Sequence, residues 1–187
     1  QKDAFQSVFD PAEKMKRLCN SLRTFSSALA ADKKPADLNQ IVRAVADTLN
    51  AGISKHLRFE FGDLPPAVVD SEEVQRVIQN LLLNAREAIA EDGNIIVRTA
   101  DLGEKVEVSV QDDGKGMSRN YMEKELFQPF HTTKSGGLGI GLFQSKKIME
   151  AHRGTILVES EEGKGTKVTL RFPAAKAEPQ ISQISQN

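Results

Sequence analysis

Apolar residues recur at helical spacing near the start of the chain. Val8, Met15, Leu22 and Leu29 stand seven residues apart within residues 5–29, and a seven-residue repeat lines one side of a helix with apolar side chains. Such a helix packs either on its own domain or in a dimeric bundle, and the length of the stripe favours the bundle. Residues 30–35 follow as a predicted hinge.

The same patterns predict three more helices and five strands. The helices fall at residues 38–51, 72–89 and 138–151, with Asp37 as the N-cap of the first and Asp70 or Ser71 as the N-cap of the second. Alternating apolar and polar residues predict strands at residues 57–61, 94–102, 105–111, 155–160 and 166–172. Residues 118–136 have no sustained period, which predicts a long loop.

Helices interleaved with hairpin-connected strands predict an α/β (α+β) fold, a two-layer sandwich of a mixed β-sheet and helices. A doubly wound dinucleotide-binding fold is disfavoured, because the strands come in adjacent pairs and no G-x-G-x-x-G follows the first strand. We expect three parts. They are a helical arm with its hinge at residues 1–34, a globular domain at residues 35–173 and a polar, disordered tail at residues 174–187.

Composition excludes some classes of function. The formal net charge is −1, which disfavours binding to nucleic acid. No apolar run approaches the roughly 18 residues that span a bilayer, so we expect no membrane contact by this chain. The single cysteine, Cys19, cannot form an internal disulfide. Because the chain begins inside a helical pattern, we expect a soluble, cytoplasmic part of a longer protein, which could carry membrane or sensor segments upstream.

Two motifs could meet at one ligand. Asn80, Asn84 and Glu87 share a face of the second predicted helix, where asparagines need either solvent or a ligand to justify them. Asp112, at a strand end, begins a D-x-G-x-G motif. Its carboxylate could accept a hydrogen bond from an amine such as that of adenine, while the glycines let the backbone approach a flat ligand. A solvated helix face and an ordinary Asp-Gly turn are the competing interpretations.

A glycine-rich run opens the last predicted helix. Backbone N–H groups there, with the positive end of the helix dipole, could cradle a phosphate. The run lacks the Lys-Ser/Thr ending of a P-loop. Hydroxyl and ammonium groups just before it could reach a terminal phosphate from the loop side. The residues concerned are Thr132, Thr133, Lys134, Gly137, Leu138, Gly139, Ile140, Gly141 and Leu142.

In this order, the motifs resemble the ATP-binding domain of histidine kinases. The N box would span residues 80–84, the G1 box 112–116, the F box 127–130 and the G2 box 137–141, and residues 149–166 are also similar. The resemblance covers roughly residues 37–173. It implies the Bergerat-type ATP-binding fold, with ATP and Mg²⁺ as cofactors. The Pro-Phe-x-Thr-Thr-Lys form is similar to that of nitrogen-regulatory-type sensor kinases and, more distantly, of exosortase-linked ones.

The resemblance also implies residue roles. Asn84 would hold Mg²⁺, and Asn80 and Lys134 would act in catalysis beside the phosphates. Asp112 would read the adenine amine, Gly114 and Gly116 would admit the base, and Gly137, Gly139 and Gly141 would let a lid close. Phe127 and Phe130 would anchor that lid by burial. Further cofactor-binding residues would be Glu87, Met117, Thr132, Thr133, Leu138, Ile140, Leu142 and Thr166.

The implied reaction transfers the ATP γ-phosphoryl group to a histidine, for relay to an aspartate of a response regulator receiver domain. Neither His56 nor His152 follows the family's acceptor pattern, and His131 is interpreted as a residue of the lid surface, so the acceptor would lie outside this chain. Residues 5–29 would form the second helix of a dimerisation hairpin in a homodimer. Three alternatives stay open: an ATPase, which would usually have a carboxylate at position 80, an anti-sigma serine kinase, and a non-catalytic nucleotide sensor or scaffold.

Overall fold

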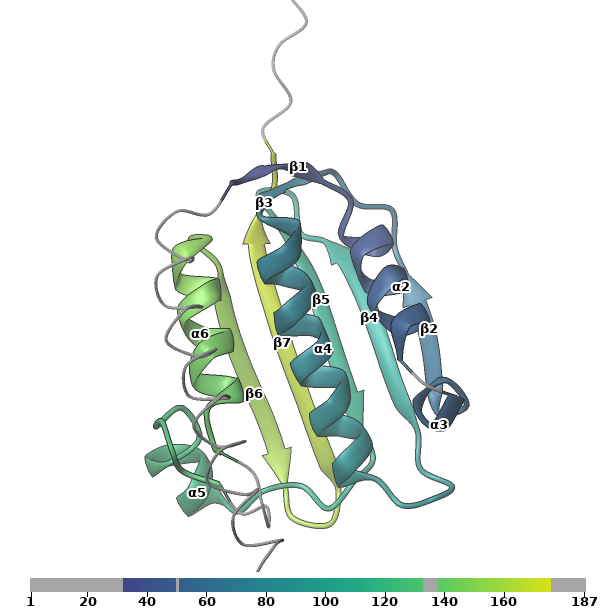
Figure 1. The fold of residues 1–187 in the computed structure, drawn as a ribbon, viewed down its shortest axis with the longest axis vertical. Coiled ribbons are helices and arrows are strands. Elements are labelled where there is room, and N and C mark those ends of the chain that lie inside the picture. Colours follow the sequence, from purple (N-terminus) through teal and green to yellow (C-terminus); the bar gives the residue numbers. More distant parts are fainter. Residues whose placement is uncertain (1–31, 50, 133–137, 176–187) are drawn as a thin grey trace, which may run out of the picture.

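The computed structural model describes residues 32–49, 51–132 and 138–175, which form a five-stranded sheet covered on one face by helices (Figure 1). The strand order is β2-β4-β5-β7-β6. β2 pairs parallel with β4, and the other neighbours pair antiparallel, so the sheet is mixed, as predicted. The strands are β2 (Leu57–Phe61), β4 (Ile95–Asp101), β5 (Lys105–Asp112), β6 (Thr155–Glu161) and β7 (Gly165–Pro173).

The helical layer confirms the predicted two-layer sandwich. Three helices run along one face of the sheet, namely α2 (Leu38–Thr48), α4 (Ser71–Ala88) and α6 (Gly141–Ala151) (Figure 1). The central helix α4 packs against both α2 and α6. The other helices in the described part of the chain are the short α3 (Ala51–Ser54) and α5 (Arg119–Lys124). No helix in that part is long and apolar enough to cross a membrane.

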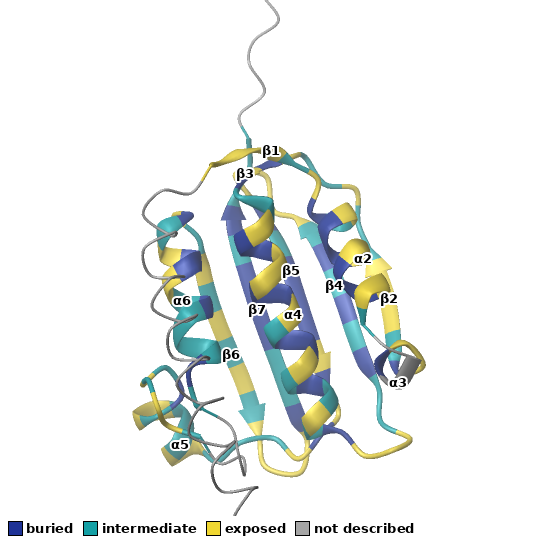
Figure 2. Cartoon of the chain, viewed as in Figure 1, coloured by how far each residue is buried: buried dark blue, intermediate teal, exposed yellow. Residues whose placement is uncertain are grey.

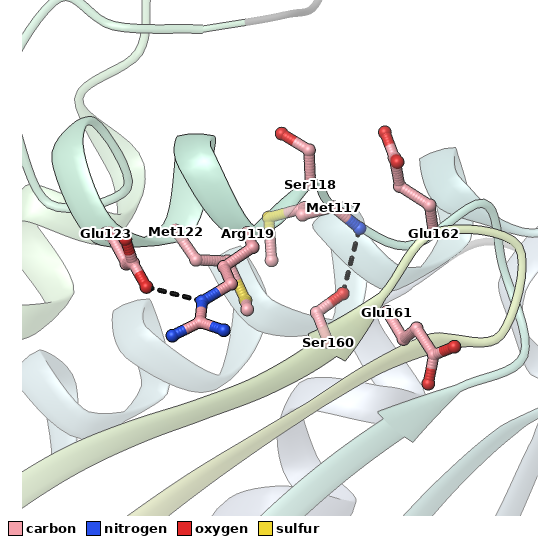
Figure 3. A pocket seen from close by; sticks show the side chains of 8 residues that line it. All are labelled: Met117, Ser118, Arg119, Met122, Glu123, Ser160, Glu161 and Glu162. Atoms are coloured by element: carbon pink, nitrogen blue, oxygen red, sulfur yellow. Dashed lines mark hydrogen bonds and ion pairs between the residues drawn. The ribbon is translucent and has the colours of Figure 1, made fainter.

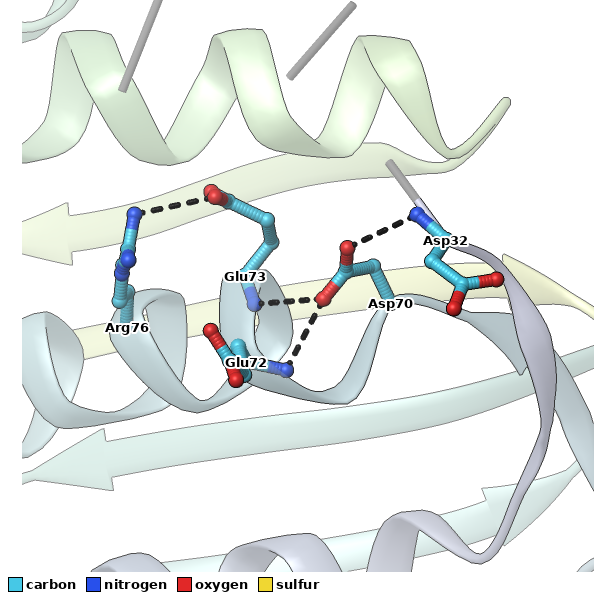
Figure 4. Close-up of polar contacts among 5 residues, drawn as sticks. All are labelled: Asp32, Asp70, Glu72, Glu73 and Arg76. Atoms are coloured by element: carbon cyan, nitrogen blue, oxygen red, sulfur yellow. Dashed lines mark hydrogen bonds and ion pairs between the residues drawn. The ribbon is translucent and has the colours of Figure 1, made fainter. Parts of the chain in front are cut away.

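The first turn of α4 shows why this helix begins where it does. The Asp70 carboxylate accepts hydrogen bonds from the backbone N–H groups of Glu72 and Glu73, at 3.1 and 3.2 Å (Figure 4). These bonds satisfy N–H donors that the start of a helix leaves unpaired. The positive end of the helix dipole also stabilises the acidic side chains of the first turn. Asp70 also accepts a bond from the Asp32 N–H at 3.1 Å, which ties the start of the described chain to this helix.

The core lies between the sheet and the helices. Figure 2 shows that the buried residues concentrate in the central strands and along α4. β4 alternates buried and half-buried positions, as expected for a strand with one covered face. The fully buried side chains include Ile78 and Leu82 of α4, Val97 of β4 and Leu170 of β7. This packing fixes α4 over the strand ends from which the site is built.

Four predicted elements differ from the observed ones. Lys34 and Pro35, predicted in the hinge, belong to β1 (Lys34–Ala36), which pairs antiparallel with β3 (Ala67–Val69). The predicted loop at residues 118–136 contains α5. Two helices are shorter than predicted, since α2 ends at Thr48 and α6 begins at Gly141. Short elements have too few residues to show a period, which is why the pattern missed them.

Ala174 and Ala175, the first two residues of the predicted tail, make backbone hydrogen bonds. The N–H of Ala174 donates to the Glu104 carbonyl at 3.0 Å, and that of Ala175 donates to the Pro66 carbonyl at 2.8 Å. These bonds extend the chain beyond β7 to the small β1–β3 sheet, so the expectation of disorder is wrong for these two residues. Residues 176–187, and the predicted helix at residues 5–29 with Cys19, lie outside the described part of the chain.

Candidate functional site

The two asparagines of α4 face the start of α6. The Asn80 Nδ2 donates a hydrogen bond to the Ser145 Oγ at 3.0 Å, and the Asn84 Nδ2 donates to the Asn80 Oδ1 at 3.5 Å. Ser145 in turn donates to the Gly141 carbonyl at 2.9 Å. Both asparagines are half-buried, and their amide groups therefore connect the middle of α4 to the first turn of α6.

Asp112 ends β5 as a buried acid, with 7% of its surface exposed. Burial raises the pKa of the Asp112 carboxyl, although hydrogen bonds from the backbone N–H groups of Gly114 and Thr166 act in the opposite direction. The bond from Gly114 is 2.9 Å long. A carboxylate held in this way is an acceptor at the edge of the core, placed to bind an amine.

The glycines after Asp112 bring this acid close to the asparagines. A Cβ on Gly114 would lie 2.5 Å from the Ala88 carbonyl oxygen, and the Lys115 N–H donates to that same oxygen at 3.1 Å. Ala88 lies one turn after Asn84 on α4. The end of β5 therefore packs on the helix turn next to Asn84, and Asn84 and Asp112 share one end of the molecule.

Two neighbours of Asp112 hold the turn in shape. Asp113 accepts bonds from the backbone N–H and the side-chain amide of Asn94, at 2.8 and 3.0 Å. Burial acts to raise the pKa of Asp113, but these bonds outweigh it, so the pKa is lowered. Gly116 has a φ of +64° and leaves no room for a Cβ beside the Glu161 carbonyl. Its left-handed backbone and close contact both require glycine.

The glycine-rich run forms the start of α6. Its N-cap residue, Ile140, makes no side-chain capping bond, and the start of a helix is a position that attracts anions. Gly141 lies against the Asn80 amide oxygen, where a Cβ would not fit. Gly139 has a φ of +64° and accepts a bond from the Phe130 N–H at 3.0 Å. This end of α6 is thus adjacent to the α4 asparagines.

The predicted anchoring of the lid by Phe130 is wrong. Phe130 is 60% exposed, and its φ of +67° turns the chain so that its N–H binds Gly139 while its ring points outward. Phe127 is half-buried, with the Lys146 ammonium 5.0 Å from its ring centroid. The buried apolar side chain of this segment is Leu126, at 6% exposure. The only sequence signal that could have identified Leu126 as the buried residue was its apolar side chain next to Phe127.

The other predicted residues fall into two groups. Met117 and Thr166 lie beside the Asp112 turn, where the Met117 N–H and the Thr166 Oγ1 each lie 2.9 Å from the Ser160 Oγ. Glu87 is exposed on α4, and Thr132, Leu138 and Leu142 are half-buried. Thr133, Lys134 and Gly137 lie outside the described residues. Ser145 and Ser160 were not predicted, because a small polar residue within a helix or strand gives no pattern of its own.

A surface cleft of about 650 Å³ adjoins this turn, between the start of α5 and the end of β6 (Figure 3). Met117 and Met122 give it apolar side chains, while Arg119 and Glu123 form an ion pair of 2.7 Å at its edge. Both charged side chains of that pair are largely exposed. Of the predicted site residues, Met117 is the one that borders the cleft.

The histidines have structural surroundings, as predicted for His56 and His152. The His152 Nε2 accepts a bond from the Asp70 N–H at 2.9 Å, so its Nδ1 carries the proton and donates to the Ile148 carbonyl at 2.8 Å. His152 is 3% exposed and His56 is 5% exposed. His131 lies at the surface, with its Nδ1 3.4 Å from the Glu125 carboxylate. Because of its two hydrogen bonds, to Asp70 and Ile148, both ring nitrogens of His152 are occupied.

Comparisons with known proteins identify the family. Residues 69–176 match the family model described as histidine kinase-, DNA gyrase B-, and HSP90-like ATPase. The chain is 39% identical over 141 residues to sporulation kinase E of Bacillus subtilis, which covers 73% of this chain and 19% of that protein. It is 33% identical over 172 residues to the sensor histidine kinase ZraS of Escherichia coli K12. That aligned region covers 90% of this chain and 37% of ZraS. The chain thus spans well under half of these relatives.

Solved structures give the same result for the fold. The nucleotide-free catalytic domain of the histidine kinase ThkA has a TM-score of 0.67 and 32% identity, covering 76% of this chain and 95% of that one. Full-length ShkA in complex with AMPPNP has a TM-score of 0.73 at 21% identity, covering 95% of this chain and 40% of that one. The mixed sheet with helices on one face is therefore that of histidine kinase catalytic domains.

Proposed function

Because the chain belongs to the family of histidine kinase-, DNA gyrase B- and HSP90-like ATPases, we propose that it is the ATP-binding catalytic part of a sensor histidine kinase. The reaction forms a bond between a histidine nitrogen and the γ-phosphorus of ATP as the bond from that phosphorus to ADP breaks. The phosphoryl group then passes to a response-regulator aspartate. The observation that supports the proposal is the contact of the Asp112 turn with the Ala88 carbonyl, one turn after Asn84 on α4.

The adenine end of the site is built around Asp112. Its carboxylate accepts the hydrogen bond of the exocyclic amine, and its burial excludes water that would compete for that bond. Gly114 and Gly116 keep the backbone close to the neighbouring elements and leave no side chain over the turn. Thr166, paired with Asp112 across β5 and β7, borders the same position from the neighbouring strand.

The phosphate end of the site is the first turn of α6. Its N–H groups and helix dipole attract phosphate oxygens, and Gly139 and Gly141 allow a close approach. Lys134 and Thr133 would add an ammonium and a hydroxyl group from the loop before it. These groups act by orientation and charge neutralisation, which is most of what a phosphoryl-transfer enzyme contributes.

The metal ligand is proposed to be Asn84. An amide oxygen is a hard donor that suits Mg²⁺, which takes one or two protein ligands beside phosphate oxygens and water, so a single side chain from α4 fits. Bound Mg²⁺ supplies positive charge to the β- and γ-phosphate oxygens. Asn80 occupies the place where hydrolysing ATPases need a general base, and an amide cannot take a proton from water. This favours a kinase over an ATPase.

The wider assembly is part of the same proposal. We propose that the full-length protein is a homodimer through a helical hairpin, that residues 5–29 form one helix of it, and that a receiver domain is the partner. The acceptor histidine is not among the three in this chain. His56 and His152 are buried, and His131 follows no acceptor pattern. We place this part of the protein in the cytoplasm, where ATP is abundant.

The chain should therefore bind ATP without labelling itself. Incubation with γ-labelled ATP and Mg²⁺ is expected to leave no acid-labile label on the chain. Label should appear on a separately added hairpin that carries the acceptor histidine of the full-length protein. The wild-type chain without Mg²⁺ provides the background. Acid-labile label on His56, His131 or His152, or ATP hydrolysis with no transfer to the hairpin, would contradict the proposed function.

A further inference from the structure

The Ser145 hydroxyl has a fixed hydrogen-bond polarity. Ser145 lies in α6 with 2% of its surface exposed, and its Oγ contacts two partners, the Gly141 carbonyl at 2.9 Å and the Asn80 side chain at 3.0 Å. A carbonyl oxygen can only accept, so the single hydroxyl proton is used on Gly141. Toward Asn80 the hydroxyl can then only accept, and the amide nitrogen of Asn80 must face it.

This polarity passes along α4. With its nitrogen toward Ser145, Asn80 presents its Oδ1 to the Asn84 Nδ2, at 3.5 Å. The same oxygen lies against Gly141, where a Cβ would not fit. The Asn80 amide is therefore enclosed by Ser145, Gly141 and Asn84. Turning it over would bring its nitrogen against the nitrogen of Asn84, two donors with no acceptor between them.

The orientation of Asn84 follows from that of Asn80. Its nitrogen faces the Asn80 oxygen, so its own amide oxygen lies at the other edge of the planar amide group. A cation is attracted by an amide oxygen and repelled by an amide NH₂ group. The order of donors and acceptors from the Gly141 carbonyl through Ser145 and Asn80 thus decides which atom Asn84 offers to a metal ion.

We propose that Ser145 is a positioning residue for Mg²⁺: its hydroxyl, through Asn80, turns the amide oxygen of Asn84 toward the ion. This inference rests on the proposed function and adds to it a residue that touches neither the metal nor the nucleotide. It also gives Asn80 a second task, because its amide transmits an orientation from the start of α6 to the metal ligand. Substituting a residue that orients a metal ligand commonly weakens metal affinity by about 10- to 100-fold.

The test compares ADP affinity with Mg²⁺ and with a chelator, by titration calorimetry. Ser145→Ala removes the acceptor that fixes Asn80 and is expected to weaken Mg²⁺-dependent ADP binding about tenfold, while ADP binding without Mg²⁺ is unchanged. Ser145→Cys, of similar shape but a weak acceptor, should act in the same direction and serves if the alanine variant does not fold. Ser109→Ala is the matched control, because Ser109 is also 2% exposed but lies in mid-sheet on β5.

A spectroscopic readout separates orientation from stability. In the wild type, adding Mg²⁺ to the ADP complex should shift the side-chain NH₂ resonances of Asn84, and in Ser145→Ala this shift should be lost. Equal Mg²⁺ dependence in wild type, Ser145→Ala and Ser145→Cys would overturn the inference and leave the proposed function standing. A wild-type chain that binds no ADP under either condition would overturn both.

Discussion

The Asp112→Asn variant should bind ATP about 10- to 150-fold more weakly than the wild type, since a hydrogen bond to a charged group contributes about 1.5–3 kcal/mol. The buried carboxylate of Asp112 is an acceptor with no proton to donate. An asparagine amide can instead turn its NH₂ group toward the adenine amine, and two donors then face each other. Titration calorimetry with ATP and Mg²⁺ near neutral pH measures the loss.

An acid at the far end of the same strand pair provides the control. Asp101→Asn removes the same charge at the exposed end of β4, opposite to the end that pairs with Asp112, and should leave ATP affinity unchanged. Loss of binding in Asp112→Asn should not reflect unfolding. Burial raises the pKa of Asp112, so the ionised group costs folding free energy at neutral pH, and protonation relieves this cost as pH falls through the raised pKa. The variant should therefore be at least as stable at neutral pH, and this advantage should shrink in acid. Equal ATP affinity in wild type and Asp112→Asn would contradict the assigned role.

Gly165→Ala should cost at least about 3 kcal/mol of unfolding free energy, because strained backbone and a buried clash act together. Gly165 begins β7 with a φ of +100°, and a Cβ there would collide with the backbone carbonyl of Asp112. That carbonyl belongs to the central strand β5, so the collision can be relieved only by separating β7 from β5. The midpoint of urea unfolding measures the change.

Gly163→Ala separates strain from collision. Gly163 lies in the same turn with a φ of +76°, and a Cβ on it would meet nothing within 4 Å. Its substitution carries the cost of the left-handed backbone alone, about 1–2 kcal/mol. If both alanine variants lose the same stability, the close packing of the turn on Asp112 is not what holds this end of the sheet together.

The sequence predicted the elements that are long and periodic. The strand at residues 57–61 was placed at its observed bounds, and the long helix was predicted to within one residue at each end, because the apolar residues of each recur at a regular spacing. The helix α5 was missed because it has no such pattern. It has six residues, none of them buried, so no amphipathic pattern marks it. The strands β1 and β3 have three residues each, too few to alternate.

The site was predictable where a residue type has one chemical use. Asp112 at a strand end, followed by two glycines, indicated an acid in a tight turn, and the structure contains both. Phe130 was not predictable, because its outward direction depends on a backbone bond to Gly139, nine residues later. Ser145 was not predictable either. Its role comes from the packing of α6 on α4, which places its hydroxyl against Asn80.

We propose that one nucleotide site lies between the Asp112 turn, α4 and the start of α6. Titrating the isotope-labelled chain with ADP and Mg²⁺, and mapping the amide resonances that shift, tests this site most directly. The largest shifts should fall at Gly114, Gly116, Ile140 and Gly141 and at the side chain of Asn84, with none around β1. Shifts confined to the cleft beside Met122, or no shifts at all, would contradict the claim.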